Sequence, residues 1–255
     1  MFKQMLTHHS SALDREMNIM IYGHGGTPFL CFPTQNSMCR NYEDFGLISQ
    51  LEDYLENGQL QLFVVDTMDA ESWSLRGGDN TRRAARQEQY YHYIVDEAVP
   101  LIQQHNDEAL PMVMGLSLGA NHAAVAFLRR PDLFGGVLAL SGVYDSDCFF
   151  DGWMNPTLYD NSPERFLPNM PHDHAYISLY NQRKMIFCVG QGAWEEDGVR
   201  TLRSLQRVFD EKGILAWCDF WGNDVNHDWP WWYKQTRYFL PHMLRDRQAR
   251  HNNSD

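Results

Sequence analysis

The stretch from Val113 to Leu128 constrains the fold of this chain most strongly. A short apolar run leads into Gly115-Leu116-Ser117-Leu118-Gly119, and an alanine-rich run follows. This order predicts a buried strand, a sharp turn and a helix, with glycines where the two backbones approach closely. The start of the helix directs free N–H groups and a positive dipole end towards Ser117. The stretch therefore predicts a nucleophilic serine at an elbow, in preference to an ordinary tight turn.

Strands and helices alternate along the rest of the chain. Apolar runs predict strands at 28–32, 60–65, 111–115, 136–141, 185–189 and 214–221. Helical patterns predict helices at 43–57, 81–105 with a kink at Pro100, 118–128, 198–212 and 229–246. Residues 2–9 and 13–22 alternate apolar and polar side chains, which predicts a hairpin. We expect an α/β fold, a mostly parallel sheet with an antiparallel N-terminal hairpin and helices on both faces.

Nothing in the 255 residues divides the chain into parts, since it has no linker, repeat or low-complexity tract. A chain of this length can bury one large core. We expect one domain over 1–247 and a polar tail at 248–255. Residues 143–175 hold four prolines and many Asn and Asp, which predicts an irregular insertion.

The net charge and the cysteines indicate which partners and which cellular compartment to expect. The formal net charge of −12 argues against nucleic acid and anionic membranes as partners. The basic cluster of Arg82, Arg83 and Arg86 is expected to be a solvated helix face. The five cysteines have no metal-type spacing, and no apolar stretch reaches the length of a membrane span. We expect no metal and a cytoplasmic location, and the sequence leaves a homo-oligomer open.

A serine hydroxyl becomes a good nucleophile only beside a base that a third group orients. The elbow resembles that of α/β-hydrolases, in which the chain order is serine, acid, histidine. Of the eleven histidines, only His227 falls in the loop after the last predicted strand, at the carboxyl edge of the sheet. His122 lies on the helix of the elbow and is expected to be packed and unreactive.

The sequence leaves several candidates for the acid and for the oxyanion donors. The loop after strand 185–189 offers Glu195, Glu196 and Asp197 in a row, and Asp145 is an outside candidate. The last two of the row also suit the first turn of the following helix. The N–H of Leu118 is expected to form the oxyanion hole with an N–H from the loop after strand 28–32. In that loop Gln35 is the first choice and Thr34 the second.

Four short motifs resemble the "putative esterase" family of α/β-hydrolases, which includes esterase D and the S-formylglutathione hydrolases. They are Gly115–Gly119, Phe32-Pro33-Thr34, Gly190-Gln191-Gly192-x-x-Glu195 and His227–Trp232. Carried over by position, the family's Gln-Gly-x-x-Asp loop marks Glu195 as the acid, with Glu in place of Asp. The resemblance implies no cofactor. His227 is followed by Asp-Trp instead of the family's Ser-Tyr, so specificity for the glutathione thioester does not transfer.

We expect a serine carboxylester hydrolase that acts on small or medium acyl esters through a Ser117-His227-Glu195 triad and an acyl-enzyme. The alternative is an acyltransferase or thioesterase on the same scaffold, and a weaker one is a binding protein without catalysis. Thr34, Trp73 and Trp153 are candidate pocket residues. The substrate is expected to be a small-molecule ester.

Overall fold

The computed structural model describes residues 1–244, so the expected tail at 248–255 lies outside the described residues. Eight strands form one sheet in the order β1-β2-β4-β3-β5-β6-β7-β8. They are β1 (Lys3–Ser10), β2 (Arg15–Tyr22), β3 (Thr27–Phe32), β4 (Leu60–Val65), β5 (Met112–Leu116), β6 (Gly136–Leu140), β7 (Lys184–Val189) and β8 (Trp217–Phe220). Strands β3 to β8 pair in parallel, whereas β2 is antiparallel to both β1 and β4. The predicted mostly parallel sheet with an antiparallel N-terminal hairpin is confirmed.

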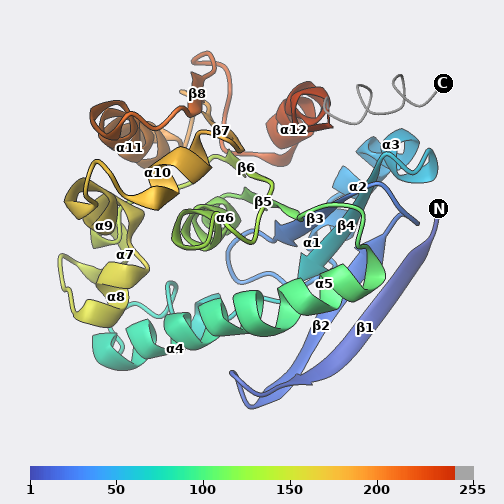
Figure 1. The fold of residues 1–255 in the computed structure, drawn as a ribbon, viewed down its shortest axis with the longest axis horizontal. Helices are drawn as coiled ribbons and strands as arrows, with labels where there is room; N and C mark the ends of the chain where they lie inside the picture. The colour runs from blue at the N-terminus through green and yellow to red at the C-terminus, as the bar shows by residue number, and fades with distance from the viewer. Residues whose placement is uncertain (245–255) are drawn as a thin grey trace.

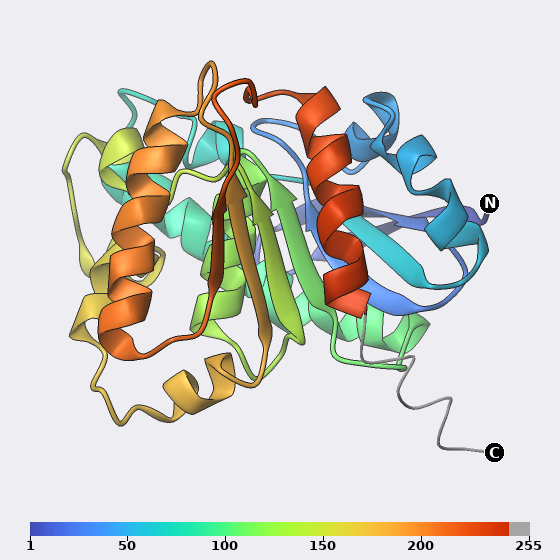
Figure 2. The ribbon, with the colours of Figure 1, turned by 90° about the horizontal axis from the view of Figure 1, so that it is seen from above.

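Helices cover both faces of this sheet (Figure 1, Figure 2). One face packs against α4 (Asn80–His92), α5 (Val99–His105), α6 (Leu118–Arg129) and α11 (Glu196–Lys212), and the other against α1 (Asn41–Asp44), α2 (Leu47–Gln50), α3 (Glu52–Glu56) and α12 (Trp229–Leu244). The two cores follow from strand geometry, since alternate side chains of each strand point to opposite faces. In β3, Leu30 and Phe32 enter one core, and Phe29 and Cys31 the other. No helix within residues 1–244 is long and apolar enough to cross a membrane.

Two expected helices are interrupted. The prediction of one helix over 43–57 is wrong, because Gly46 adopts a left-handed φ of 79° between α1 and α2. The predicted long helix at 81–105 is present, but a π-helical segment η2 (Tyr93–Ala98) separates α4 from α5. Its disturbance lies directly before Pro100, whose ring nitrogen carries no hydrogen to donate to a carbonyl one turn earlier.

The segment 143–175, predicted to be irregular, contains short helices. These are α7 (Asp147–Phe150), α8 (Pro156–Asp160) and α9 (Pro163–Asn169), and α10 (Ala175–Tyr180) begins at its end. Proline at the first turn of α8 and α9 explains how a proline-rich sequence supports helices, since the first-turn N–H groups have no intrahelical partner.

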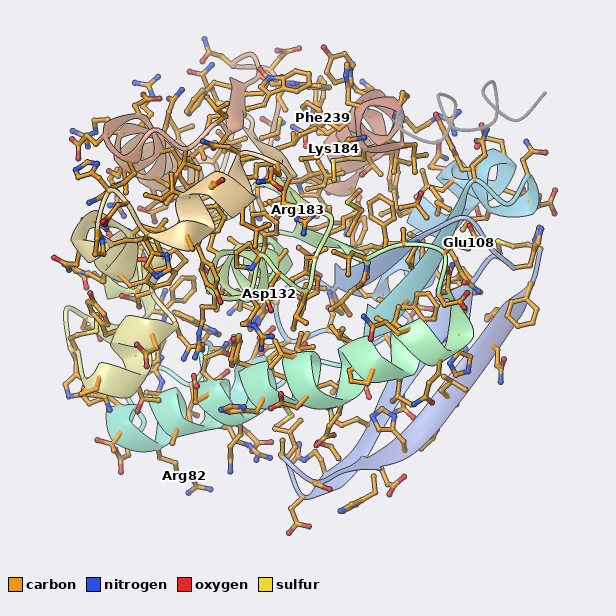
Figure 3. The ribbon with its side chains drawn as sticks, viewed as in Figure 1. Arg82, Glu108, Asp132, Arg183, Lys184 and Phe239 are labelled. Carbon is orange, nitrogen blue, oxygen red and sulfur yellow. The ribbon has the colours of Figure 1, made fainter. Side chains whose placement is uncertain are left out.

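The expected solvated face is confirmed for Arg82 and is wrong for the other two arginines. Arg82 points away from the molecule at the start of α4 (Figure 3). Arg86 is mostly buried and pairs with Glu71 at 2.8 Å. Arg83 is 1% exposed. Its backbone carbonyl partners lie outside its own helix, in the loop before α4 and in α7, which helical periodicity cannot reveal.

Candidate active site

Ser117 stands at the elbow between β5 and α6. Its backbone adopts φ 58° and ψ −126°, a region that costs a non-glycine residue about 1–3 kcal/mol. A Cβ on Gly115 would lie 1.9 Å from the backbone oxygen of Gly119, and a Cβ on Gly119 would lie 2.3 Å from that of Phe32. Glycine is therefore required at both positions. The turn holds the serine hydroxyl clear of the sheet, in front of the first N–H groups of α6.

Three loops at the carboxyl edge of the sheet bring Ser117, His227 and Glu195 together. The Nε2 atom of His227 lies 2.8 Å from Oγ of Ser117, and its Nδ1 atom lies 3.1 Å from Oε2 of Glu195. The backbone N–H of His227 donates to the carbonyl of Ala193 at 3.0 Å, which joins the loop after β8 to the loop after β7. The imidazole is 22% exposed and the carboxylate 1%. We call this arrangement the Ser117–His227–Glu195 array.

The other candidate acids lie outside the array. Glu196 and Asp197 occupy the first turn of α11 and are exposed. Asp197 pairs with Arg200 at 3.0 Å, and Asp145 pairs with the same guanidinium at 3.1 Å. Of the four carboxylates, only that of Glu195 contacts His227.

Two further residues hold the Glu195 carboxylate, and sequence reasoning missed both. Its Oε1 atom accepts hydrogen bonds from the Ser141 hydroxyl at 2.6 Å and from the Gly190 N–H at 3.3 Å. The indole N–H of Trp232 donates to the Ser141 hydroxyl at 3.0 Å, and the Trp232 ring meets the His227 ring edge to face at 5.1 Å. A buried carboxylate is costly without such donors. The available signal is a small polar residue at the end of the predicted strand 136–141, at the edge that carries Ser117.

Two backbone N–H groups on adjoining segments, α6 and the loop after β3, have no acceptor among the described residues. They belong to Leu118, at the start of α6, and to Gln35, in the loop after β3. The Thr34 N–H donates to Oδ1 of Asn41 at 3.1 Å, and the Asn36 N–H donates to Oδ2 of Asp69 at 2.9 Å. The Gln35 side chain donates to the Ser74 hydroxyl at 2.7 Å. Free donors on both segments can bind an oxyanion.

A small aromatic cluster packs beside Leu118. It joins Trp73, Ala84, Leu118, Phe150 and Leu158, with Phe149, Trp153 and Met154 packed against it at its partly exposed side. Trp73 meets the rings of Phe149 and Phe150 edge to face at 5.2 and 5.4 Å. Trp73 is 1% exposed, so it supports the cluster from within, whereas Trp153 is half-buried.

Arg83 holds this cluster together. Its guanidinium donates to the carbonyls of Ser72 at 2.9 Å, Trp73 at 3.1 Å and Phe149 at 2.8 Å, and lies 4.0 Å from the centroid of the Phe150 ring. Burial lowers the pKa of this guanidinium. The planar fork of donors explains why an arginine is buried here, since one side chain satisfies carbonyls from the loop before α4 and from α7.

Glu164 makes the stability of the segment 143–175 depend on pH. Its Oε1 atom accepts from the N–H and the hydroxyl of Ser146, each at 2.9 Å. Burial, with a smaller contribution from nearby Asp145, raises its pKa from the ordinary 4.5 to about 7. The folded state therefore binds this proton more tightly than the unfolded state does. The resulting stability is fully present below pH 4.5 and is lost as the pH rises through about 7.

Glu164→Gln should remove this dependence, because a neutral amide keeps the acceptor for Ser146. The free energy of unfolding of the variant, relative to the wild type, should rise by about 2 kcal/mol between about pH 5 and pH 8. Urea unfolding at both pH values measures the difference. Glu52→Gln, at an exposed position of α3, is the control. Equal relative stability of the Glu164 variant at the two pH values would contradict the prediction.

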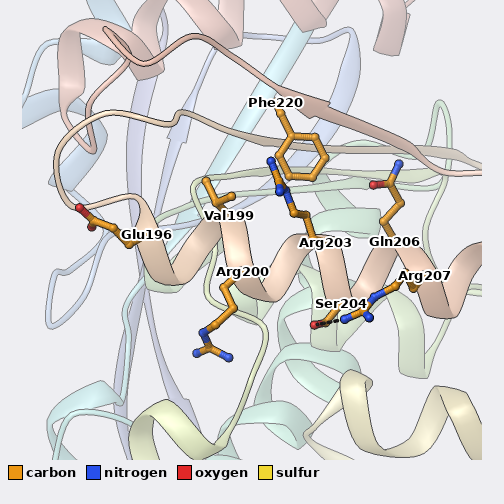
Figure 4. Close-up of a pocket in the computed structure, with 8 residues that line it drawn as sticks. All are labelled: Glu196, Val199, Arg200, Arg203, Ser204, Gln206, Arg207 and Phe220. Atoms are coloured by element: carbon orange, nitrogen blue, oxygen red, sulfur yellow. Dashed lines mark hydrogen bonds between the residues drawn. The ribbon is translucent and has the colours of Figure 1, made fainter.

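A groove along α11 and β8 is separate from the array (Figure 4). Its lining residues are Glu196, Val199, Arg200, Arg203, Ser204, Gln206, Arg207 and Phe220. None of them forms a hydrogen bond with Ser117 or His227. This surface is therefore distinct from the space in front of Ser117.

Comparison with known proteins places the chain among related sequences and folds. The sequence model of the family described as "Putative esterase" matches residues 10–243. Comparison with curated proteins gives no match. Similar solved structures include a ferulic acid esterase, with TM-score 0.73, 13% identity, and coverage of 96% of this chain and 97% of that chain. An S-formylglutathione hydrolase from Staphylococcus aureus has a TM-score of 0.64 and 15% identity, and the match covers 95% of this chain and 96% of that chain. One from Agrobacterium tumefaciens has a TM-score of 0.65 and 14% identity, with coverage of 95% of this chain and 93% of that chain.

Proposed function

The chain belongs to the putative esterase family and is a serine esterase, and from this premise we propose that Ser117, His227 and Glu195 are its catalytic triad. The observation that carries the proposal is the continuous array: 2.8 Å from Ser117 to His227 and 3.1 Å from His227 to a buried carboxylate. An ionised carboxylate only accepts hydrogen bonds. The proton of neutral His227 therefore lies on Nδ1, which leaves Nε2 free to accept from the serine.

The proposed reaction proceeds through an acyl-enzyme. Ser117 attacks the acyl carbon while His227 takes its proton, and Glu195 stabilises the imidazolium. The N–H groups of Leu118 and Gln35 bind the oxyanion of the tetrahedral intermediate. His227 then gives the proton to the departing alcohol, and water releases the acyl group by the same steps.

We propose small or medium acyl groups as substrates. The support is the aromatic cluster beside Leu118, where Phe149, Trp153 and Met154 offer apolar surface at the side of the oxyanion donors. Apolar side chains bind an acyl chain through burial of its surface. The tight packing of Trp73 within the cluster favours a short pocket.

The proposed compartment is a reducing cytoplasm. All five cysteines are free thiols. Burial raises the pKa of Cys39 and Cys218 to about 12, which keeps these thiols protonated and slow to oxidise.

A panel of p-nitrophenyl esters from acetate to laurate tests the function, together with labelling by a fluorophosphonate. We expect the highest kcat/KM for acetate or butyrate, with a fall of about tenfold or more by laurate, and probe labelling at Ser117. A maximum at laurate would contradict the short-pocket proposal. Folded protein that neither hydrolyses esters nor takes the label would contradict the esterase itself. If added methanol or a thiol accepts the acyl group faster than water does, the chain is a transferase.

A further inference from the structure

A second buried carboxylate–imidazole pair lies behind the proposed active site. Nε2 of His122, on α6, is 2.7 Å from Oδ1 of Asp69, the first residue of the 3₁₀ helix η1 (Asp69–Glu71). Their side chains are 2% and 0% exposed. Burying such a pair is costly, and apolar residues of similar volume often serve stability equally well. None of the reaction steps above uses either group.

Asp69 holds the loop that carries the Gln35 N–H. Its Oδ2 atom accepts from the N–H of Asn36 at 2.9 Å, and Asn36 has a left-handed φ of 58°. Its backbone carbonyl accepts from the N–H of Ser74 at 2.8 Å, and the Ser74 hydroxyl accepts from the Gln35 amide at 2.7 Å. Asp69 thus restrains Gln35 from two sides, through the next residue and through its own side chain.

His122 connects this assembly to the helix of the nucleophile. It lies on α6, five residues after Ser117. Its ring stacks on Phe32 at 5.8 Å and meets Tyr90 edge to face at 5.1 Å, so packing fixes its orientation. Phe32 ends β3, directly before the loop that holds Gln35. The pair therefore bridges α6 and the loop after β3.

We propose that Asp69 and His122 are positioning residues that set the distance between the two oxyanion donors. This inference rests on the proposed function. The Leu118 N–H belongs to α6 and the Gln35 N–H to the loop after β3, and the two residues are 83 positions apart in the sequence. Two donors stabilise one oxyanion only if both lie at hydrogen-bond distance from the same point. The Asp69–His122 pair joins their two segments through side-chain hydrogen bonds.

The chemistry of the pair suits this role better than an apolar contact would. A carboxylate has lone pairs on both oxygens, so it accepts from the imidazole and from the Asn36 N–H at once. Hydrogen bonds to a charged group are short and directional. An asparagine at position 69 would offer one oxygen and an NH₂ group, so with the His122 proton on Nε2 it would lose one of the two bonds.

The test separates positioning from packing. His122→Phe keeps an aromatic ring against Phe32 but has no donor, and His122→Gln keeps an N–H that can reach Asp69. We expect His122→Phe and Asp69→Asn to lower kcat by about 10–100-fold with KM changed less than about twofold. His122→Gln should recover a large part of that loss. His92→Phe is the matched control, since His92 pairs with Asp96 at 2.8 Å on the exposed side of α4.

Inhibition by an alkylboronic acid distinguishes positioning from packing. The tetrahedral adduct of the boronic acid places an oxygen between the two donors, so its affinity depends on the distance between them. Its affinity should fall in parallel with kcat, while the affinity for a planar substrate amide stays near that of the wild type. All rates are normalised to active sites titrated with the fluorophosphonate, so a smaller fraction of folded protein does not lower the measured kcat.

Wild-type kcat in titrated His122→Phe and Asp69→Asn would overturn the proposal, as would an equal loss in His122→Gln and His122→Phe. Equal loss of affinity for the boronic acid and the amide would also overturn it. These outcomes require an active wild type. If the wild type neither hydrolyses esters nor reacts with the probe, the proposed function fails instead.

Discussion

Replacing Ser117 by alanine is expected to lower kcat for p-nitrophenyl acetate by about 10⁵-fold or more. Without the hydroxyl no acyl-enzyme forms, and His227 has no nucleophile within 2.8 Å to activate. The residual rate comes from the oxyanion donors acting on a water molecule. Steady-state hydrolysis measures the loss, and the fluorophosphonate label should disappear with it.

Ser178→Ala is the control for this result. Ser178 is exposed on α10, where its hydroxyl accepts a hydrogen bond from Gln182, so its loss should leave hydrolysis and labelling unchanged. Circular dichroism shows whether both variants are folded. Hydrolysis by Ser117→Ala above about one hundredth of the wild-type rate would contradict Ser117 as the nucleophile.

Replacing Glu195 by glutamine is expected to lower kcat by about 10³–10⁴-fold, whereas Asp197→Asn should change it less than about twofold. A glutamine has no charge to stabilise the imidazolium, and its NH₂ group can face Nδ1 of His227 and reverse the tautomer. Asp197 is 65% exposed and pairs with Arg200, so its charge reaches no reacting atom.

The two variants form a matched comparison, because each removes one carboxylate at the start of α11 without changing the volume of the side chain. Single-turnover acylation measures the chemical step directly and separates it from product release. A larger loss of kcat in Asp197→Asn than in Glu195→Gln would mean that Asp197 is the acid and that the proposed role of Glu195 is wrong. Equal, small losses in both would mean that His227 does not depend on an acid from this loop.

The sequence alone predicts the parallel sheet and two members of the array. The apolar run before Ser117 and the glycines at 115 and 119 indicate the elbow, because a buried strand and a close turn leave few alternatives. His227 follows from chain order. The choice among residues 195 to 197 needed the family resemblance, since periodicity does not say which of three adjacent carboxylates turns inward. In the structure, Glu195 precedes α11 and faces the core, while the next two residues face solvent.

The features that the sequence did not reveal are those defined by distant partners. Arg83 has the pattern of a surface residue, and only its contacts with the loop before α4 and with α7 explain its burial. Ser141 and Asp69 are ordinary polar residues until the fold brings Glu195 and His122 to them. The break at Gly46 depends on one backbone angle within an otherwise helical pattern.

Because of the position of β8, the protein can lose its activity before it loses its fold. This strand has four residues, none fully buried, and it pairs only with β7 at one edge of the sheet. Short edge elements with few buried contacts open locally at a lower free energy than the core does. Because His227 lies in the loop after β8, detachment of this strand would carry the base away from Ser117 while the other seven strands stay paired. Heat inactivation can then precede global unfolding, at a temperature that reports on this edge.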